Sequence, residues 1–314
     1  MTRLAAAASL IALVAAAGSN GAAHPAGRIA FALDRGDISS IWSVRADGSG
    51  LRQITKPFVR QGFGGDSGPV WSGDGRKLAF ARDLPYWGSD RFRLHVVGAG
   101  GRGDEEVTSG PFDVMPAWSP TRRLAFVRLV TGDTVTVSTI YAVTPGGRPE
   151  KLILGSSDVT PSWSPDGRSI AFARLENGQP KLFLADADGS NVRSLGLGGS
   201  QPAWSPDSQR LAFVSAADGY GATCGGGGCA PNGELYTVRS DGSGLTRLTR
   251  TKADEGHPTW SPDGSRIAFT SGYDLASSGH YPWLMIVPAD GGRAIRITRL
   301  TGIHDPAWSP ASVR

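Results

Sequence analysis

Cysteine, histidine and lysine are scarce in this chain of 314 residues. It has two cysteines and five histidines, and only five of its 32 basic residues are lysine. Cys224 and Cys229 have no second cysteine pair and no nearby histidine to complete a tetrahedral zinc site, and five histidines leave little material for a catalytic metal centre. The formal net charge is +4. No run of basic residues provides the localised positive surface that nucleic-acid binding requires, so we expect no nucleic-acid partner.

A long apolar run is also missing. Residues 4–17 are apolar, but this stretch is shorter than the roughly 20 residues that a transmembrane helix needs. Arg3 precedes it and small residues follow it, which predicts an export signal at residues 1–23 and a mature domain at residues 24–314. An uncleaved membrane anchor is the alternative. We expect an exported protein, periplasmic or extracellular, that is not integral to the membrane after cleavage.

Motifs of known catalytic chemistry are absent. The chain has no Gly-x-Ser-x-Gly elbow, no His-Glu-x-x-His, no complete EF-hand loop and no phosphate-binding loop. Residues 65–69 reproduce the Gly-Asp-Ser-Gly-Pro string of trypsin-like proteases. That chemistry needs a histidine base, which precedes the serine in that family, and the only upstream histidine is His24. We interpret the string as a coincidence and predict no catalytic residues.

One phrase occurs six times along the chain. A Trp-Ser pair, usually preceded by Pro and followed by Pro-Asp-Gly, leads into an Ile/Leu-Ala-Phe triplet. The Trp-Ser pairs begin at Trp71, Trp118, Trp163, Trp204, Trp260 and Trp308, and the triplets end at Phe31, Phe80, Phe126, Phe172, Phe213 and Phe269. The first triplet has no Trp-Ser before it, and the last Trp-Ser has no triplet after it. The two ends of the chain therefore complete one repeat between them.

Each repeat predicts four short strands. In the copy at residues 160–195, strands are expected at 161–163, 169–173, 181–185 and 192–195, with turns at 164–167 and 188–190. Pro presets the backbone of the first turn and Gly takes its left-handed position. Such a sheet cannot bury both faces alone, so the sheets stack radially. We expect an all-β protein, a six-bladed β-propeller of four-stranded antiparallel blades, closed by pairing of its N- and C-terminal strands.

The phrase Pro-x-Trp-Ser-Pro-Asp-Gly-x-x-Ile/Leu-Ala-Phe resembles the WD40-like (PD40) repeat of TolB-type six-bladed propellers. Similar repeats occur in the propeller domains of prolyl-oligopeptidase-type peptidases. The resemblance runs from about Gly27 to Pro310. It implies the fold, but this fold hosts many functions.

Several copies depart from the pattern. Residues 72–75 lack the Pro, residues 119–123 are one residue short, and Asp207-Ser208 replaces Asp-Gly. TolB proteins carry an α/β domain before the propeller, and the peptidases carry an α/β-hydrolase domain. Only the signal-like segment precedes Gly27, so we expect neither domain and no role identical to that of TolB.

Acidic residues recur near the start of the expected first strands. Those strands begin on one face of the ring, so the acids and two neighbouring histidines are expected around the mouth of the central channel. They are Asp66, Asp113, Asp158, Glu255, His257, His304 and Asp305. Such a mouth would suit a basic peptide segment or a cation, with Ca²⁺ favoured by hard oxygen ligands. The alternative is that the carboxylates cap turns in water and the histidines are polar rim residues.

Loops between the second and third strands should lie on the same face. They carry the aromatic residues Tyr86, Trp87, Tyr220, Tyr273 and Tyr281. These could form an interaction surface or could cover the sheet ends; the nearby Trp283 could begin a strand and lie in the core. Cys224 and Cys229, separated by four Gly, predict a small local disulfide in an exported protein.

These observations favour a monomeric binding module over an enzyme. One ring face, with its acidic mouth and aromatic loops, would hold a protein or peptide partner. The alternative is a propeller enzyme, a polysaccharide lyase or hydrolase, with a metal or carboxylate site in the channel. A third hypothesis is a structural scaffold stabilised by Ca²⁺, the one cofactor that the acidic residues suggest.

Overall fold

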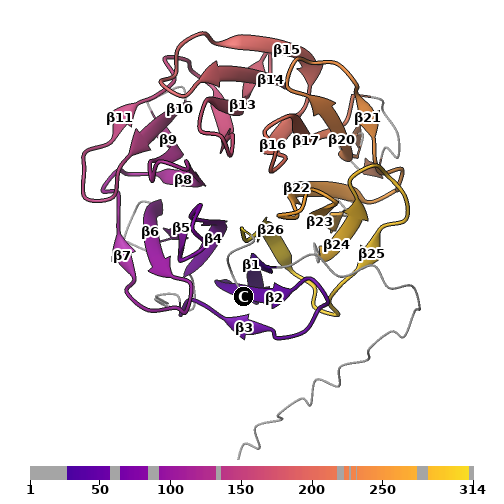
Figure 1. Ribbon diagram of the computed structural model, residues 1–314, viewed down its shortest axis with the longest axis horizontal. Coiled ribbons are helices and arrows are strands. Elements are labelled where there is room, and N and C mark those ends of the chain that lie inside the picture. The colour runs from indigo at the N-terminus through magenta and orange to yellow at the C-terminus, as the bar shows by residue number, and fades with distance from the viewer. Residues whose placement is uncertain are drawn as a thin grey trace, which may run out of the picture.

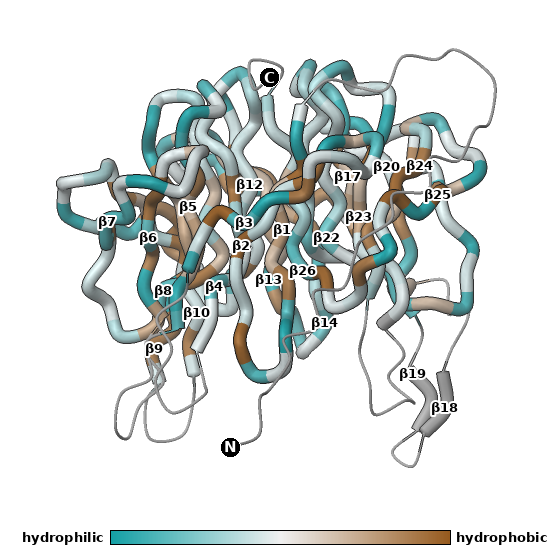
Figure 2. Tube along the Cα trace, turned by 90° about the horizontal axis from the view of Figure 1, so that it is seen from below, coloured by the Kyte–Doolittle hydropathy of each residue, from teal (hydrophilic) through white to brown (hydrophobic). Residues whose placement is uncertain are grey.

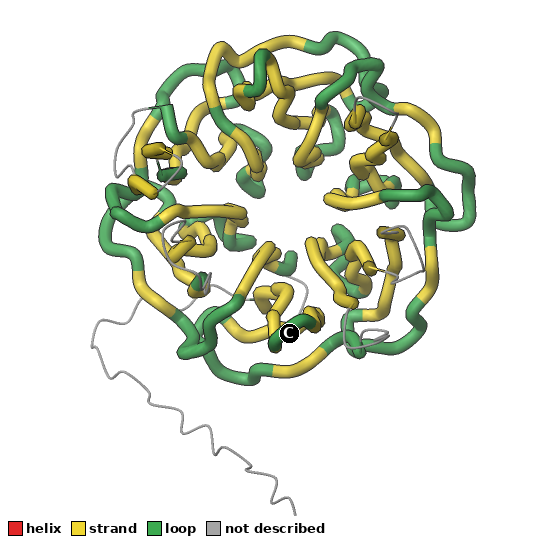
Figure 3. The backbone as a smooth tube through the Cα atoms, turned by 180° about the vertical axis from the view of Figure 1, so that it is seen from behind, coloured by secondary structure: helices red, strands yellow, loops and turns green. Residues whose placement is uncertain are grey.

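The chain is built from strands, turns and loops. The computed structural model describes residues 27–56, 64–83, 92–131, 136–217, 223–225, 228–230, 232–273 and 282–310. Within these ranges there is no helix (Figure 3). Accordingly, no helix of the described part has the length and apolar character to cross a membrane.

Four-stranded antiparallel sheets stand side by side around a common centre (Figure 1). We call each of them a blade and name it after its innermost strand. The β4 blade contains β4 Gly64–Trp71, β5 Lys77–Asp83, β6 Phe92–Gly98 and β7 Glu105–Glu106. The β8 blade contains β8 Asp113–Trp118, β9 Leu124–Thr131, β10 Thr136–Val143 and β11 Glu150–Lys151. The β12 blade contains β12 Asp158–Trp163, β13 Ser169–Glu176, β14 Gln179–Asp186 and β15 Arg193–Gly198.

The remaining blades follow the same order. The β16 blade contains β16 Ser200–Trp204, β17 Arg210–Ser215, β20 Glu234–Arg239 and β21 Thr246–Arg247, and β18 Thr223–Gly225 pairs with β19 Gly228–Ala230 in a separate hairpin. The β22 blade contains β22 Asp254–Trp260, β23 Arg266–Tyr273, β24 Trp283–Pro288 and β25 Ile295–Arg296. The β26 blade contains β26 Ile303–Trp308, β1 Arg28–Arg35, β2 Ile38–Arg45 and β3 Arg52–Gln53.

The first described strand lies beside the last. β1 pairs with β26 antiparallel, with Ile29 opposite Trp308 and Leu33 opposite Ile303. β2 also makes a short parallel pairing with β4 through Ile38. This parallel contact joins the β26 and β4 blades into one eight-stranded sheet.

The aromatic residues of the repeat fill the space between neighbouring blades. All six triplet phenylalanines are at most 1% exposed. In one cluster, Trp163 and Phe172 of the β12 blade pack against Ala125 and Ile140 of the β8 blade. Burying such side chains from both sheets stabilises a stack that neither sheet could form alone, as the repeat predicts.

The Ser-Pro-Asp-Gly segments form the expected turns. Ser164 Oγ donates to Asp166 Oδ1 over 2.6 Å, the Arg168 N–H donates to the same oxygen over 3.0 Å, and Gly167 has φ 73°. In the two degenerate copies the left-handed position is held by Arg122 and Ser208, with φ 64° and 59°. The turn geometry therefore survives without glycine, at the cost of a strained backbone.

The two rims of the molecule differ in construction. The inner strands begin at one rim, where the second strands end and the third strands start; we call it the loop rim. The Ser-Pro-Asp-Gly turns lie at the opposite rim, the turn rim. Figure 2 views the strands from the side, with the ends of β9 and β10 at its lower edge, which is the loop rim.

Candidate functional site

A bulge recurs in every inner strand, at the residue directly before the repeat's Pro. The ladder between the first and second strands shifts register there, as between Val159 and Ser162. The bulged residues all have left-handed backbones: Gly68, Met115, Thr160, Gln201, His257 and Asp305, with φ between 49° and 58°. A residue before proline avoids helical dihedrals, and a side chain disfavours positive φ, so five of the six positions are strained. We call these six residues the throat ring.

Members of the throat ring on neighbouring blades hydrogen-bond to one another. The Gln201 N–H donates to Thr160 Oγ1 over 3.3 Å, and the His257 N–H donates to Gln201 Oε1 over 2.7 Å. The Gly68 N–H donates to Asp305 Oδ2 over 3.1 Å. Each bond runs from the backbone of one blade to the side chain of the preceding blade. The left-handed bulge thus turns the side chains toward each other around the centre.

His257 and Asp305 form the ion pair of the throat ring. His257 Nε2 lies 2.9 Å from Asp305 Oδ1, and the two side chains are 33% and 26% exposed. Burial lowers the pKa of His257, but the Asp305 carboxylate outweighs it, so the pKa lies above its usual value. Burial raises the pKa of Asp305, yet His257 and the Gly68 N–H hold it at about 2. The pair is therefore charged in mildly acidic solution.

At three positions the predicted carboxylates lie inside the protein and not at an exposed mouth. Asp66, Asp113 and Asp158 are all fully buried. Each is opposed across the first two strands by an arginine, and each pair makes two hydrogen bonds. The pairs are Asp66 with Arg82, Asp113 with Arg128, and Asp158 with Arg174. They neither cap turns in water nor line an open mouth.

The register explains this difference. Asp158 lies directly opposite Arg174, two residues beyond the triplet Phe172. The same arginine position is occupied in the β4 and β8 blades, so the sequence carried a signal that was missed. The guanidinium of Arg174 also lies over the ring of Phe183, 4.9 Å from its centroid. A bidentate, stacked arginine is the partner that makes a fully buried carboxylate tolerable.

Glu255 occupies the same position in the β22 blade without an arginine. It is 3% exposed, and Thr251 Oγ1 and Ser271 Oγ donate to its Oε1 over 2.6 and 3.3 Å. Its Oε2 has no hydrogen-bond partner within the described ranges. Burial raises the pKa of Glu255 to about 8, and the nearby charges of Glu234 and Asp254 add to the effect. Glu255 is therefore neutral at neutral pH.

The remaining predicted residues are dispersed. His304 Nε2 lies 2.7 Å from Asp34 Oδ2, across the pairing of β26 with β1. Trp283 begins β24 as expected, but it is 37% exposed under the guanidinium of Arg296 and does not belong to the core. The other aromatic residues, Tyr86, Trp87, Tyr220 and Tyr281, fall outside the described residues, as does the side chain of Tyr273.

Cys224 and Cys229 occupy opposite backbone positions in the hairpin of β18 and β19. The backbone register pairs them directly. Such a position is compatible with a disulfide, which remains a prediction. Metal ligands are not gathered in the described part of the chain, where no group of three or more His, Cys, Asp or Glu is placed to hold an ion.

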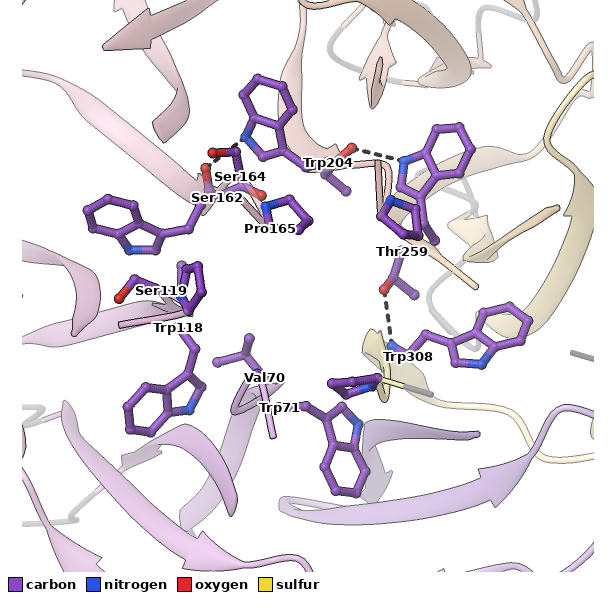
Figure 4. Close-up of a pocket in the computed structure, with 18 of the residues that line it drawn as sticks. Val70, Trp71, Trp118, Ser119, Ser162, Ser164, Pro165, Trp204, Thr259 and Trp308 are labelled. Atoms are coloured by element: carbon purple, nitrogen blue, oxygen red, sulfur yellow. Dashed lines mark hydrogen bonds between the residues drawn. The ribbon is translucent and has the colours of Figure 1, made fainter. Parts of the chain in front are cut away.

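The turn-rim end of the channel is a cavity of about 460 Å³. Figure 4 shows the indole rings of Trp71, Trp118, Trp204 and Trp308 pointing outward between blades, with Pro165 nearer the centre. Small residues such as Val70 and Ser162 complete the wall. This end therefore has an uncharged wall in which polar and apolar surface are about equal, whereas the throat ring contains a charged pair.

Exposed apolar side chains are more numerous at the loop rim than at the turn rim. Nine large hydrophobic residues are exposed in the described part of the chain, and six of them lie at this rim: Met115, Val130, Val137, Leu154, Leu175 and Trp283. Val130 and Val137 are paired across β9 and β10. We call Met115, Val130, Val137, Leu154 and Leu175, which belong to the adjacent β8 and β12 blades or their connection, the apolar rim patch.

Comparisons with known proteins establish the fold. No protein-family model matches the chain. Dipeptidyl-peptidase 5 of Porphyromonas gingivalis is 53% identical over 38 residues, 12% of this chain, and a tricorn protease homolog of Streptomyces coelicolor is 36% identical over 80 residues, 24% of this chain. The chain spans only 6% of the length of each relative.

Solved structures match over most of the chain. TolB from Acinetobacter baumannii superposes with a TM-score of 0.69 at 21% identity, covering 90% of this chain and 67% of that one. A TolB from Agrobacterium tumefaciens gives 0.66 at 20% identity, covering 90% and 92%. An oligogalacturonate lyase from Vibrio parahaemolyticus gives 0.55 at 16%, covering 87% and 74%. The chain is a TolB-like β-propeller, and at these identities the likeness shows the fold alone.

Proposed function

We propose that this chain is an exported, monomeric, six-bladed propeller, closed by the pairing of β26 with β1, that binds a protein or peptide partner through its loop rim. The carrying observation is the apolar rim patch beside the throat ring. A concentration of exposed apolar side chains on one rim supports a binding surface there. A partner with an apolar segment would cover the patch and remove it from water.

Polar residues on the opposite side of the loop rim would orient the bound partner. His257, Asp305, His304 and Asp34 lie in the β22 and β26 blades, across the ring from the β8 and β12 blades that carry the patch. A partner segment with apolar residues on one side and polar or basic residues on the other would match both halves. Of the acidic residues in the sequence hypothesis, Asp305 alone is ionised without an arginine partner, since Asp66, Asp113 and Asp158 are paired with arginines and the pKa of Glu255 is raised. Asp34, beside His304, is an acid at this rim that the sequence did not predict.

The test is capture of a partner by residues 24–314 from cells of the source organism. One double variant, Val130→Ser with Leu175→Ser, removes exposed side chains from the loop rim. The matched control, Val192→Ser with Leu245→Ser, removes exposed side chains that follow turns at the opposite rim. We expect a protein retained by the wild type and the control but lost by the first variant. Equal retention by all three would refute the loop rim as the binding surface.

Export has its own test. Residues 1–23 should be removed on secretion, so the amino terminus of the mature protein should map close to His24. Recovery of full-length protein in the membrane fraction would instead favour the uncleaved anchor.

An enzymatic role is the second candidate. The observation that favours it is the His257–Asp305 pair at the centre of a fold shared with an oligogalacturonate lyase. A polysaccharide lyase would release unsaturated products from polygalacturonate, measured by absorbance with and without added Ca²⁺ or Mn²⁺. Activity that His257→Asn abolishes would support this candidate over the binding module. A rise in melting temperature with Ca²⁺, without activity, would support the scaffold hypothesis.

A further inference from the structure

Hydrogen bonds from tryptophan tie most inner strands to their neighbours near the turn rim. The indole N–H of each donates to a backbone oxygen of the preceding blade: Trp71 to Ala307 over 3.0 Å, Trp204 to Ser162 over 3.1 Å, and Trp260 to Ala203 over 3.0 Å. Trp308 makes the equivalent connection through its backbone N–H, which donates to Thr259 Oγ1 over 3.0 Å. These bonds tie β12 to β16, β16 to β22, β22 to β26 and β26 to β4.

The two seams that flank β8 lack this bond. The indole nitrogens of Trp118 and Trp163 are buried and have no hydrogen-bond partner within the described ranges. These are the donors that would tie β8 to β4 and β12 to β8. A buried N–H without a partner is unfavourable and calls for an explanation.

The throat ring is interrupted at the same two seams. Its bonds run from Thr160 through Gln201, His257 and Asp305 to Gly68 and join the same four pairs of strands. Met115 of β8 stands in the gap. Its thioether is at best a weak acceptor, the preceding Gly68 offers no side chain, and Met115 is 43% exposed. Two independent sets of bonds, at opposite ends of the channel, therefore both omit β8.

The β8 blade remains attached to the β4 blade at the start of β8 and through β9. Phe112, just before β8, forms a parallel bridge with Phe92 of β6, and their rings lie 4.7 Å apart. Apolar side chains such as Leu124 and Phe126 pack against the β4 blade. Apolar packing has no directional requirement, so it tolerates a small displacement that a hydrogen bond would resist.

We propose that β8 is the yielding wall of the channel: its segment from Met115 to Trp118 moves while Phe112 and β9 stay attached to the β4 blade. Met115 shares its left-handed backbone, φ 54°, with the bulged residues of the other inner strands, so the missing hydrogen bonds and not backbone strain distinguish β8. The opening would admit a segment of the partner, and only this consequence rests on the proposed function. Met115 belongs both to the moving strand and to the apolar rim patch, so docking and opening would be coupled.

Hydrogen exchange of the full chain, followed by mass spectrometry, tests the movement without a partner. Backbone amides of β8 should exchange at least tenfold faster than those of β16 and β22, the equivalent inner strands, because local opening sets the rate. Met115→Gln places a carboxamide where Gln201 has one and should slow exchange in β8 toward that of the other strands. Equal rates for the three strands in the wild type would overturn the proposal.

A second comparison does not depend on the engineered bond. Trp118→Phe removes an indole N–H that has no partner, whereas Trp204→Phe and Trp260→Phe remove one that is bonded. The first should lower the melting temperature by less than half as much as either of the others. Equal losses would contradict the inference. If the amides of β8 exchange faster than those of β16 and β22 but no partner is captured, the proposed function is refuted and the proposed movement of β8 is not.

Discussion

Glu255 faces Ser271 across β22 and β23, at the register position where the β4, β8 and β12 blades oppose an aspartate to an arginine. In the β12 blade the same position pairs Asp158 with Arg174. The β12 blade therefore neutralises its buried carboxylate with the guanidinium of Arg174, whereas the β22 blade does so by protonation of Glu255. The consequences of the two solutions for stability are different and measurable.

Glu255 should make the protein less stable at alkaline pH. Its pKa is raised from 4.5 to about 8, so the folded state binds the proton more tightly than the unfolded state. Its stabilising contribution is complete below pH 4.5 and is lost as the pH rises through about 8. The loss amounts to roughly 3–5 kcal/mol. Glu255→Gln mimics the neutral acid, so between pH 5 and 9 the free energy of unfolding of this variant should fall less than that of the wild type. Parallel curves would contradict the prediction.

Arg174→Met should destabilise the protein strongly. The change leaves the fully buried Asp158 without its cation, although the apolar contact with Phe183 is kept. Loss of one partner of a buried pair costs on the order of 3–5 kcal/mol. The control is Lys181→Met, which breaks an exposed pair with Glu176 (2.8 Å) on the same blade and should cost less than about 1 kcal/mol. Urea unfolding of both variants gives the comparison, and similar midpoints would refute it.

Arg122→Gly should stabilise the protein by about 0.5–1 kcal/mol. Arg122 has φ 64° in the shortened turn of the β8 blade, where intact repeats use glycine. Relief of the left-handed strain exceeds the added entropy of glycine in the unfolded chain. Ser208→Gly is the control: Ser208 is equally strained, but its Oγ accepts the Asp166 N–H over 3.0 Å, and this bond would be lost. Its gain should be smaller, which thermal unfolding can resolve.

The His257–Asp305 pair should stabilise the protein most between about pH 4 and 6.5. The raised pKa of His257 gives a contribution that is present below its unfolded value of 6.5 and lost as the pH rises through the folded value. The pKa of Asp305 is lowered from 3.8 to about 2, so its contribution to stability is present above pH 3.8 and is lost as the pH falls toward 2. Asp305→Asn should therefore cost most stability within this window and less at pH 9. Proton NMR should also show a lower pKa for His257 in the variant; an unchanged value would contradict the assignment.

The repeat made most of the architecture predictable. Each copy contains its own turn-forming residues and its own buried Trp and Phe. Backbone preferences and the pattern of buried residues therefore predict the same strands along most of the chain. The blade order and the burial of residues such as Phe172 followed directly. The turns of the two repeats that lack glycine could also be predicted, because Arg122 and Ser208 adopt the left-handed backbone of the glycine that they replace.

The candidate site was predictable only in part. The chain order identified Asp305 and His257 but missed Gln201, Thr160 and Met115, because the bulge that brings them together appears in the sequence only as an unremarked residue before Pro. Asp66, Asp113 and Asp158 were assigned to an open mouth, since the arginines that oppose them lie 15 or 16 positions away.

The sequence by itself thus determined an all-β chain of repeated four-stranded units, because turn geometry and alternating burial are local properties that each copy states independently. The tertiary structure alone decided which carboxylates are paired, which one is protonated, and which inner strand lacks hydrogen bonds to its neighbours. These properties depend on distances between blades and on the strand register at each bulge, where one residue more or less changes which atoms meet.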